Sequence, residues 1–347
     1  MANDLRERLI DLAADAPVAT SVPPELLTRA RRRVVARVVS LAAAVILVAG
    51  VAVGALRVLG QGATPEPAQP SETVDTFSDL RGKILYPSIG LSGEGEAVDP
   101  TDPTVPVTFA LPKGWSPIDW SRDGQHILAR TWRNHGGLGI MNEDGTTELI
   151  REAPTDGWGS FSPDGSSVVF PTSAGLEVYQ LGTGEARTIL PLVKREGFWG
   201  PAWSPDGSTI VFFDDVPGDR SSVVAVAPDG SGRRVLTTLP DRRYTETGPF
   251  EWSPDGSELV FWLNVTKNGG SIWAVDADGS NLRQLTDWRG NVWPSWSPDG
   301  SRIAFVRKGA LYTMAPDGTD QRPVADIRPG WAIVWTAPAP EAGASSG

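Results

Sequence analysis

The chain has 347 residues, no cysteine, two histidines and a formal net charge of −11 at pH 7. This composition excludes disulfides, thiolate nucleophiles, thiolate metal sites and a histidine-rich metal centre. Because the residues after Arg57 include 23 basic and 37 acidic side chains, they lack the basic surface that binding to nucleic acid requires.

Residues 1–36 are predicted to form a cytoplasmic helical tail. Residues 3–15 fit a short amphipathic helix, with Asn3 as its N-cap and Leu5, Leu9 and Leu12 on one side. A second helix is expected to begin near Pro24 and to carry a group of arginines towards Arg37.

Residues 37–58 are predicted to form a single transmembrane helix. Residues 38–56 are uncharged over 19 positions, which is long enough to cross a bilayer. Five arginines between residues 29 and 37 flank this run on one side and Arg57 flanks it on the other. We therefore expect a plasma-membrane protein with a cytoplasmic N-terminus and everything after the span outside the cytoplasm. The alternative is a cleaved signal peptide, although the roughly 37 residues ahead of the run are long for one.

Residues 59–76 are rich in proline and polar residues without periodicity and are predicted to be a stalk. Residues 339–347 are similar, and we expect them to be a disordered tail.

A repeated turn dominates the rest of the chain. WSPDG begins at Trp203, Trp252 and Trp296, and two variants, FSPDG and WSRDG, begin at Phe161 and Trp120. The copies are separated by 41, 42, 49 and 44 residues, and a short apolar strand follows each one. Proline suits the second position of a type I turn, and glycine the left-handed position after it. The period and the short strands are typical of a β-propeller with four-stranded blades.

The two ends of the repeat region are predicted to complete one blade. Residues 83–87, 96–99 and 107–111 fit the second, third and fourth strands of a blade that lacks its first. Residues 330–338 fit a first strand, with Trp335 at the tryptophan position of the motif. We therefore predict an all-β, six-bladed propeller over residues 77–338, closed by a C-terminal strand that leaves no exposed sheet edge between the ends.

The repeated W-S-P-D-G-x-x-I-x-F pattern resembles the TolB-type (WD40-like) propeller repeat over roughly 260 of the 347 residues. The resemblance implies a mostly non-catalytic module that binds proteins or peptides in the bacterial envelope, or a gating domain of prolyl-oligopeptidase-like peptidases. The printed sequence ends after the ring without a hydrolase domain, so we expect no enzymatic activity. The tail, span and stalk ahead of the ring resemble actinobacterial membrane proteins.

The predicted binding residues lie in loops on the face opposite the WSPDG turns. Aromatic and arginine side chains there are typical of a binding surface. The candidates are Trp158, Trp199, Arg243, Tyr244, Trp288, Arg289 and Trp331. The alternative for Trp199, Trp293 and Trp331 is packing between blades.

No metal or cofactor is predicted. Asp214, Asp215 and Asp219 form the best candidate for Ca²⁺ ligands, but a solvated acidic turn is the preferred interpretation.

Three functions remain open. The first is a membrane-anchored module that binds an envelope protein or peptide. The second is a transmembrane regulator whose residues 1–36 bind a cytoplasmic partner, as anti-sigma factors do. The third is a propeller hydrolase or lyase that acts on glycans or lactones.

Overall fold

A computed structural model of the chain describes residues 72–74, 77–87, 94–131, 137–151, 158–192, 197–215, 221–240, 244–265, 269–287, 290–325 and 332–337. They belong to one compact unit that begins at Gln69. The predicted cytoplasmic tail, membrane helix and C-terminal tail lie outside the described residues. Within the described part, no helix is long and apolar enough to cross a membrane.

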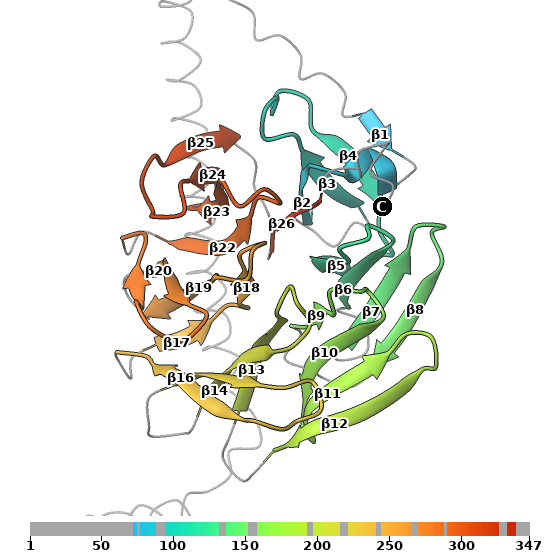
Figure 1. Cartoon of the computed structure of the whole chain (residues 1–347). Helices are drawn as coiled ribbons and strands as arrows, with labels where there is room; N and C mark the ends of the chain where they lie inside the picture. Colours follow the sequence, from blue (N-terminus) through green and yellow to red (C-terminus); the bar gives the residue numbers. More distant parts are fainter. Residues whose placement is uncertain are drawn as a thin grey trace, which may run out of the picture. The chain divides into compact units, whose positions relative to one another are not determined.

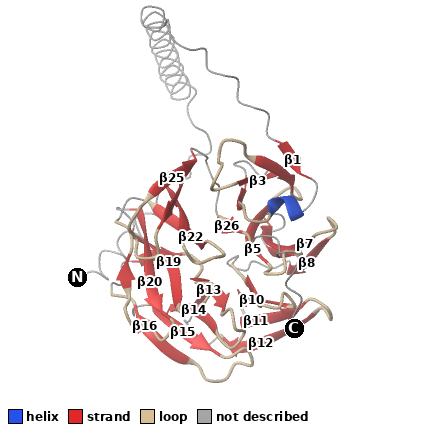
Figure 2. Ribbon diagram, turned by 45° about the horizontal axis from the view of Figure 1, so that its top comes forward, coloured by secondary structure: helices blue, strands red, loops and turns tan. Residues whose placement is uncertain are grey.

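Six sheets are arranged around a central axis as the blades of a propeller (Figures 1 and 2). The first blade in chain order consists of β26 (Val334–Trp335), β2 (Ile84–Pro87), β3 (Glu94–Val98) and β4 (Val107–Ala110). The second consists of β5 (Trp115–Trp120), β6 (His126–Thr131), β7 (Gly137–Asn142) and β8 (Thr147–Arg151). The third consists of β9 (Ser160–Phe161), β10 (Ser167–Thr172), β11 (Gly175–Gln180) and β12 (Glu185–Pro191). We number these blades 1 to 3. The all-β, six-bladed prediction is confirmed.

Blades 4 to 6 follow the same order. Blade 4 consists of β13 (Gly197–Trp203), β14 (Ile210–Asp215), β15 (Ser222–Val226) and β16 (Arg234–Thr238). Blade 5 consists of β17 (Tyr244–Thr247), β18 (Glu251–Trp252), β19 (Glu258–Val265), β20 (Gly269–Asp276) and β21 (Arg283–Gln284). Blade 6 consists of β22 (Asn291–Trp296), β23 (Ile303–Arg307), β24 (Ala310–Met314) and β25 (Arg322–Ala325). In blade 5 the first strand is divided into β17 and β18, and both segments pair with β19.

The ring closes as the sequence predicts. Strand β26 pairs antiparallel with β2, which places Val334 opposite Leu85 and Trp335 opposite Ile84. Beyond this pair, the buried hydroxyl of Thr336 donates to the carbonyl oxygen of Leu80 at 2.7 Å. The Thr336 amide also donates to the Lys83 carbonyl at 3.0 Å. These bonds join residues more than 250 positions apart in the chain.

Blade 1 also takes up residues that we assigned to the stalk. Strand β1 (Glu72–Val74) pairs in parallel with the outer strand β4, and a short 3₁₀ helix, η1 (Phe77–Leu80), follows it. The unpaired edge of β4 offers backbone donors and acceptors to an extended segment. The sheet therefore begins before residue 77, because edge pairing does not depend on the repeat motif.

The hydrophobic core is divided among the six interfaces between neighbouring blades. Phe212 packs with residues of blade 3, whereas the next residue, Phe213, packs with residues of blade 5. Successive side chains of a strand point to opposite faces, and both faces are covered here. This explains why the second strand of each blade is a continuous apolar run and not an alternating one.

The WSPDG turns are held by their own side chains. In the turn of blade 6, Asp299 Oδ1 accepts from the Ser297 hydroxyl at 2.6 Å and from the Ser301 amide at 3.0 Å. The Ser297 hydroxyl in turn accepts from the Arg302 amide at 2.8 Å. Gly300 has a φ of +71°, which glycine adopts without a steric cost. These contacts show that the repeated serine and aspartate residues stabilise the turn.

Replacing Asp299 with alanine is expected to lower the free energy of unfolding by about 1–2 kcal/mol, since it leaves several donors in the turn without their acceptor. Asp299→Asn keeps an acceptor oxygen and should cost less. The Ser297 hydroxyl is the main cause of a pKa for Asp299 below its usual value. The stabilisation by Asp299 should therefore be present above pH 3.8 and be lost as the pH falls further. Urea unfolding of both variants at neutral pH measures the difference, and equal losses would contradict this role.

Candidate binding site

The innermost strands of all six blades contribute to one cavity of about 100 Å³ on the axis. Each blade places in it the residue that immediately precedes the aromatic residue of its turn motif. In blade order from 1 to 6, these residues are Val334, Asp119, Ser160, Ala202, Glu251 and Ser295. We call them the axial ring.

Four members of the axial ring join their blade to the next one. Each accepts a hydrogen bond from the backbone amide of the aromatic residue in the following blade. The bonds are Phe161 N to Asp119 Oδ2 at 2.8 Å, Trp203 N to Ser160 Oγ at 3.3 Å, Trp296 N to Glu251 Oε1 at 3.0 Å, and Trp335 N to Ser295 Oγ at 2.9 Å. The polar members of the ring therefore have a structural role in addition to any role in binding.

The two carboxyl groups come from opposite sides of the ring, Asp119 from blade 2 and Glu251 from blade 5. Burial raises the pKa of Asp119 to about 6, against hydrogen bonds from Phe161 and Trp120. Burial, with a smaller contribution from the charge of Asp119, raises the pKa of Glu251 to about 8. At neutral pH Glu251 is therefore protonated and Asp119 carries a negative charge.

The free energy of unfolding should depend on pH because of the proton that Glu251 binds in the folded chain. Between pH 4.5, the ordinary pKa of a glutamate, and pH 8, the folded chain holds a proton on Glu251 that the unfolded chain has released. Its contribution to stability is fully present below pH 4.5 and is lost as the pH rises through 8. Across this window we expect a decrease on the order of 5 kcal/mol, because one pKa unit corresponds to about 1.4 kcal/mol.

Glu251→Gln keeps the oxygen that accepts from Trp296 N and removes the titration. Urea unfolding at several pH values across the window should show the decrease in the native chain and a much shallower slope in this variant. Equal slopes in the two proteins would mean that Glu251 does not titrate in this range.

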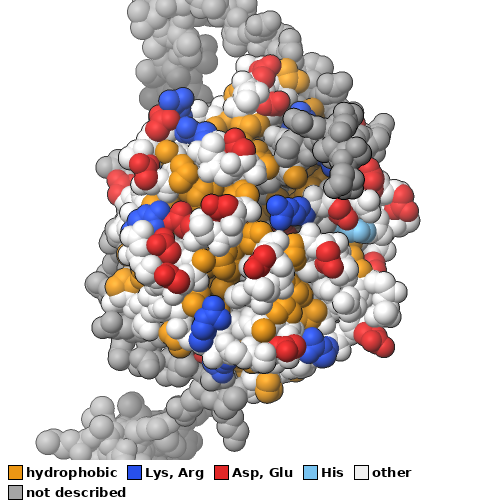
Figure 3. All heavy atoms as spheres, in the orientation of Figure 1, with side chains coloured by type: hydrophobic (Ala, Val, Ile, Leu, Met, Phe, Trp, Pro, Cys, Tyr) orange, Lys and Arg blue, Asp and Glu red, His pale blue; other side chains and the backbone are white. Residues whose placement is uncertain are grey.

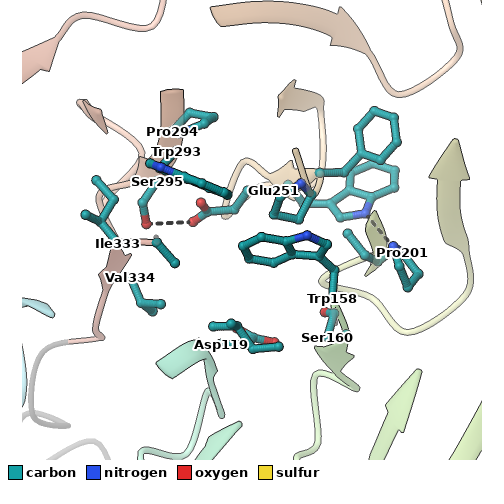
Figure 4. Close-up of a pocket in the computed structure, with 17 residues that line it drawn as sticks. Asp119, Trp158, Ser160, Pro201, Glu251, Trp293, Pro294, Ser295, Ile333 and Val334 are labelled. Atoms are coloured by element: carbon teal, nitrogen blue, oxygen red, sulfur yellow. Dashed lines mark hydrogen bonds between the residues drawn. The ribbon is translucent and has the colours of Figure 1, made fainter. Parts of the chain in front are cut away.

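Two tryptophans from opposite blades meet in the cavity. Trp158, before β9 in blade 3, and Trp293, in β22 of blade 6, have ring centroids 5.0 Å apart and planes inclined by 35°. Trp293 also makes an edge contact with Trp262, at 5.0 Å. Figure 4 shows the side chains of Trp158, Trp293 and Glu251 pointing towards one another, with Asp119 on the other side of the cavity.

The backbone of Trp293 is strained. Its φ is +57°, within an interruption of the β22–β23 register. Gly200 occupies the equivalent position in blade 4, three residues before the motif tryptophan, and has a φ of +54°. This conformation suits glycine but costs a tryptophan on the order of 1–3 kcal/mol. Such strain is concentrated at functional sites, and here it directs a large aromatic side chain into the axial cavity.

Of the predicted binding residues, Trp158 lines the cavity and Trp199 does not. Trp199 is half-buried and packs against the core between blades 4 and 5, which agrees with the packing alternative for it. Tyr244 begins β17. The other four predicted binding residues lie outside the described residues: Arg243, Trp288, Arg289 and Trp331.

Sequence reasoning missed Asp119 and Glu251 and did not select Trp293. The available signal was the charged residue directly before the motif tryptophan in PIDW and PFEW, at a position where the other blades have small or apolar residues. Repeat alignment identifies that position, but not that it faces the axis.

The acidic segment that we considered for Ca²⁺ has other contacts. The carboxylate of Asp214 pairs with Arg233, and Asp215 accepts from the Ser221 hydroxyl at 3.1 Å. Asp219 lies outside the described residues. Among the side chains that the structure describes, no group of three or more histidine, aspartate or glutamate residues could hold a metal ion.

A second cavity, of about 410 Å³, lies among the WSPDG turns. Arg122, which replaces the motif proline, donates from Nη1 to the carbonyl oxygen of Pro205 at 3.4 Å and so joins blades 2 and 4. The aspartates that line this cavity, Asp206 and Asp255, accept hydrogen bonds from serine hydroxyls within their own turns. Figure 3 shows one face of the ring, on which hydrophobic side chains gather towards the middle among dispersed charged groups.

The sequence matches no family model and no curated protein. Among solved structures, TolB from Acinetobacter baumannii is similar with a TM-score of 0.60 at 19% identity, over 75% of this chain and 67% of that one. A putative TolB from Agrobacterium tumefaciens has a TM-score of 0.53 at 20% identity, over 73% and 91%. A chain of a nidogen/laminin complex has a TM-score of 0.56 at 13% identity, over 73% and 97%. These likenesses concern the fold.

Proposed function

We propose that this TolB-like propeller is a membrane-anchored, extracytoplasmic module that binds a protein or peptide of the bacterial cell envelope without catalysing a reaction. The observation that carries the proposal is the axial cavity, where Trp158 and Trp293 converge from opposite blades. Tryptophans in a preformed hollow are typical anchors of protein recognition. The resemblance of the repeats to TolB-type propellers supports the same role.

The membrane location rests on the sequence of residues 38–56 and on the arginines that precede them. A chain without cysteine allows a direct test, because one introduced thiol is the only thiol present. We expect a membrane-impermeant maleimide to label Ser231→Cys, an exposed turn position, in intact cells, and to label Ala2→Cys only after lysis. Labelling of Ala2→Cys in intact cells, or protection of Ser231→Cys, would refute this topology.

A hydrolase or lyase is the second candidate, because two opposed carboxyls with raised pKa values are a common acid–base arrangement. The binding role is better supported, since both carboxyls already accept backbone amides that join neighbouring blades. Turnover of an oligosaccharide or lactone panel by the native chain, abolished in Glu251→Gln, would favour the enzyme.

A further inference from the structure

The charge of the axial cavity is unbalanced. Among the described residues, 17 line the cavity; Asp119 and Glu251 are the only ionisable ones of these, and none of the 17 is a lysine, arginine or histidine. A buried carboxylate without a counter-ion is costly. A cationic group entering the cavity would supply the missing charge, whereas an anionic group would face only repulsion.

The aromatic walls favour the same charge. Trp158 and Trp293 line the cavity beside the carboxyls. The face of an indole ring attracts a cation more strongly than the face of a tyrosine or phenylalanine ring, and the attraction grows as the site becomes desolvated. Apolar parts of the wall, including Ile118, Ile333 and Val334, suit a hydrocarbon stem behind the charge.

The size of the cavity limits what can enter. Its volume of about 100 Å³ is well below the roughly 300–1,000 Å³ of sites that enclose a whole small-molecule ligand. A single side chain or head group is the natural occupant. A compact ammonium group on an unbranched stem fits better than a planar guanidinium, whose five donors would have few acceptors, because Asp119 and Glu251 already accept backbone amides.

We propose that the axial cavity receives a primary alkylammonium group, presented as a lysine side chain of the protein partner, between Trp158, Trp293, Asp119 and Glu251. This inference rests on the proposed binding function and specifies its chemistry. The ammonium group would lie against the two carboxyls, and its stem would lie against the indole rings. Because Glu251 is protonated at neutral pH, binding of the ammonium group there would release up to one proton to the solvent.

The test uses the full chain in detergent and isothermal titration with Nα-acetyl-lysine amide. Nα-acetyl-norleucine amide is the neutral control with a similar stem. We expect the lysine derivative to bind at least about tenfold more tightly, since one charge-assisted contact is worth about 1.4 kcal/mol or more. Titration in two buffers of different ionisation enthalpy should reveal the released proton.

Variants locate the effect. Glu251→Gln and Asp119→Asn keep acceptor oxygens for Trp296 N and Phe161 N, and each should weaken binding of the lysine derivative about tenfold. Glu143→Gln, at an exposed turn position, is the matched control and should change nothing. Equal affinity for the lysine and norleucine derivatives, or no effect of either axial variant while the fold is intact, would overturn the proposal.

Two further measurements distinguish a free amine from a lysine side chain as the source of the ammonium group, and distinguish failure of this inference from failure of the proposed binding function. If 1,5-diaminopentane binds more than tenfold more tightly than the lysine derivative, the ammonium chemistry stands and the lysine source is refuted. If the chain captures an envelope protein through the Trp158 face but does not bind the lysine derivative, the ammonium inference fails while the proposed function stands.

Discussion

A chain shortened to end at Ile327 is expected to lose on the order of 5 kcal/mol of unfolding free energy. It lacks strand β26 and with it the closure of the ring. Burial of Ile333 is worth about 2–5 kcal/mol, and each hydrogen bond made by Thr336 about 1 kcal/mol. Typical domains have 5–15 kcal/mol in total, so we expect blade 1 to lose its native pairing.

The matched control ends at Pro338, which keeps β26 and removes only the predicted tail. Guanidinium unfolding and hydrogen exchange of the amides in β2 (Ile84–Pro87) distinguish the two chains. Full protection of β2 in the shorter chain would show that closure by β26 does not stabilise blade 1.

Replacing Trp158 and Trp293 together with alanine should weaken binding of the protein partner about a hundredfold, corresponding to about 2.7 kcal/mol. The double variant removes both indole rings from the cavity and leaves the inter-blade hydrogen bonds of the axial ring in place. Relief of the strained backbone at Trp293 should offset part of the stability lost with the two rings.

The control for this prediction is Trp273→Ala. Trp273 lies in β20, the third strand of blade 5, and its indole nitrogen donates to the Ser271 hydroxyl at 2.8 Å. It is absent from the lining of the cavity. If Trp273→Ala weakens binding as much as the double variant does, the tryptophans act through general stability and not through contact with the partner.

The architecture could be predicted from the sequence because its determinants are local and repeated. The Ser-Pro-Asp-Gly turn fixes its own conformation through contacts such as those of Asp299 with Ser297 and Ser301. The repeat then sets the length of each blade, and incomplete repeats at both ends indicate closure. The predicted strand at residues 83–87 and the observed β2 (Ile84–Pro87) differ by one residue.

The binding site could be predicted only in part, because it depends on contacts between distant segments. Trp158 follows from the loop pattern, but its contact with Trp293 joins opposite blades across the axis. The left-handed backbone that directs Trp293 inward is not visible in the sequence, because a tryptophan before a proline gives no reason to expect it. The edge pairing of β1 with β4 likewise could not be predicted, because β1 is not part of the repeat motif.

The most direct test of the account is photo-cross-linking in living cells, with a photoreactive aromatic amino acid, which keeps an aromatic ring at the cavity, in the full-length chain at position 158 or at position 208. Ser208 is exposed and directly follows the WSPDG turn of blade 4, at the opposite end of the first strands. We predict that the probe at 158 captures a defined envelope protein and that Trp293→Ala abolishes the capture. Capture of that protein from position 208 but not from 158 would contradict binding at the axial cavity.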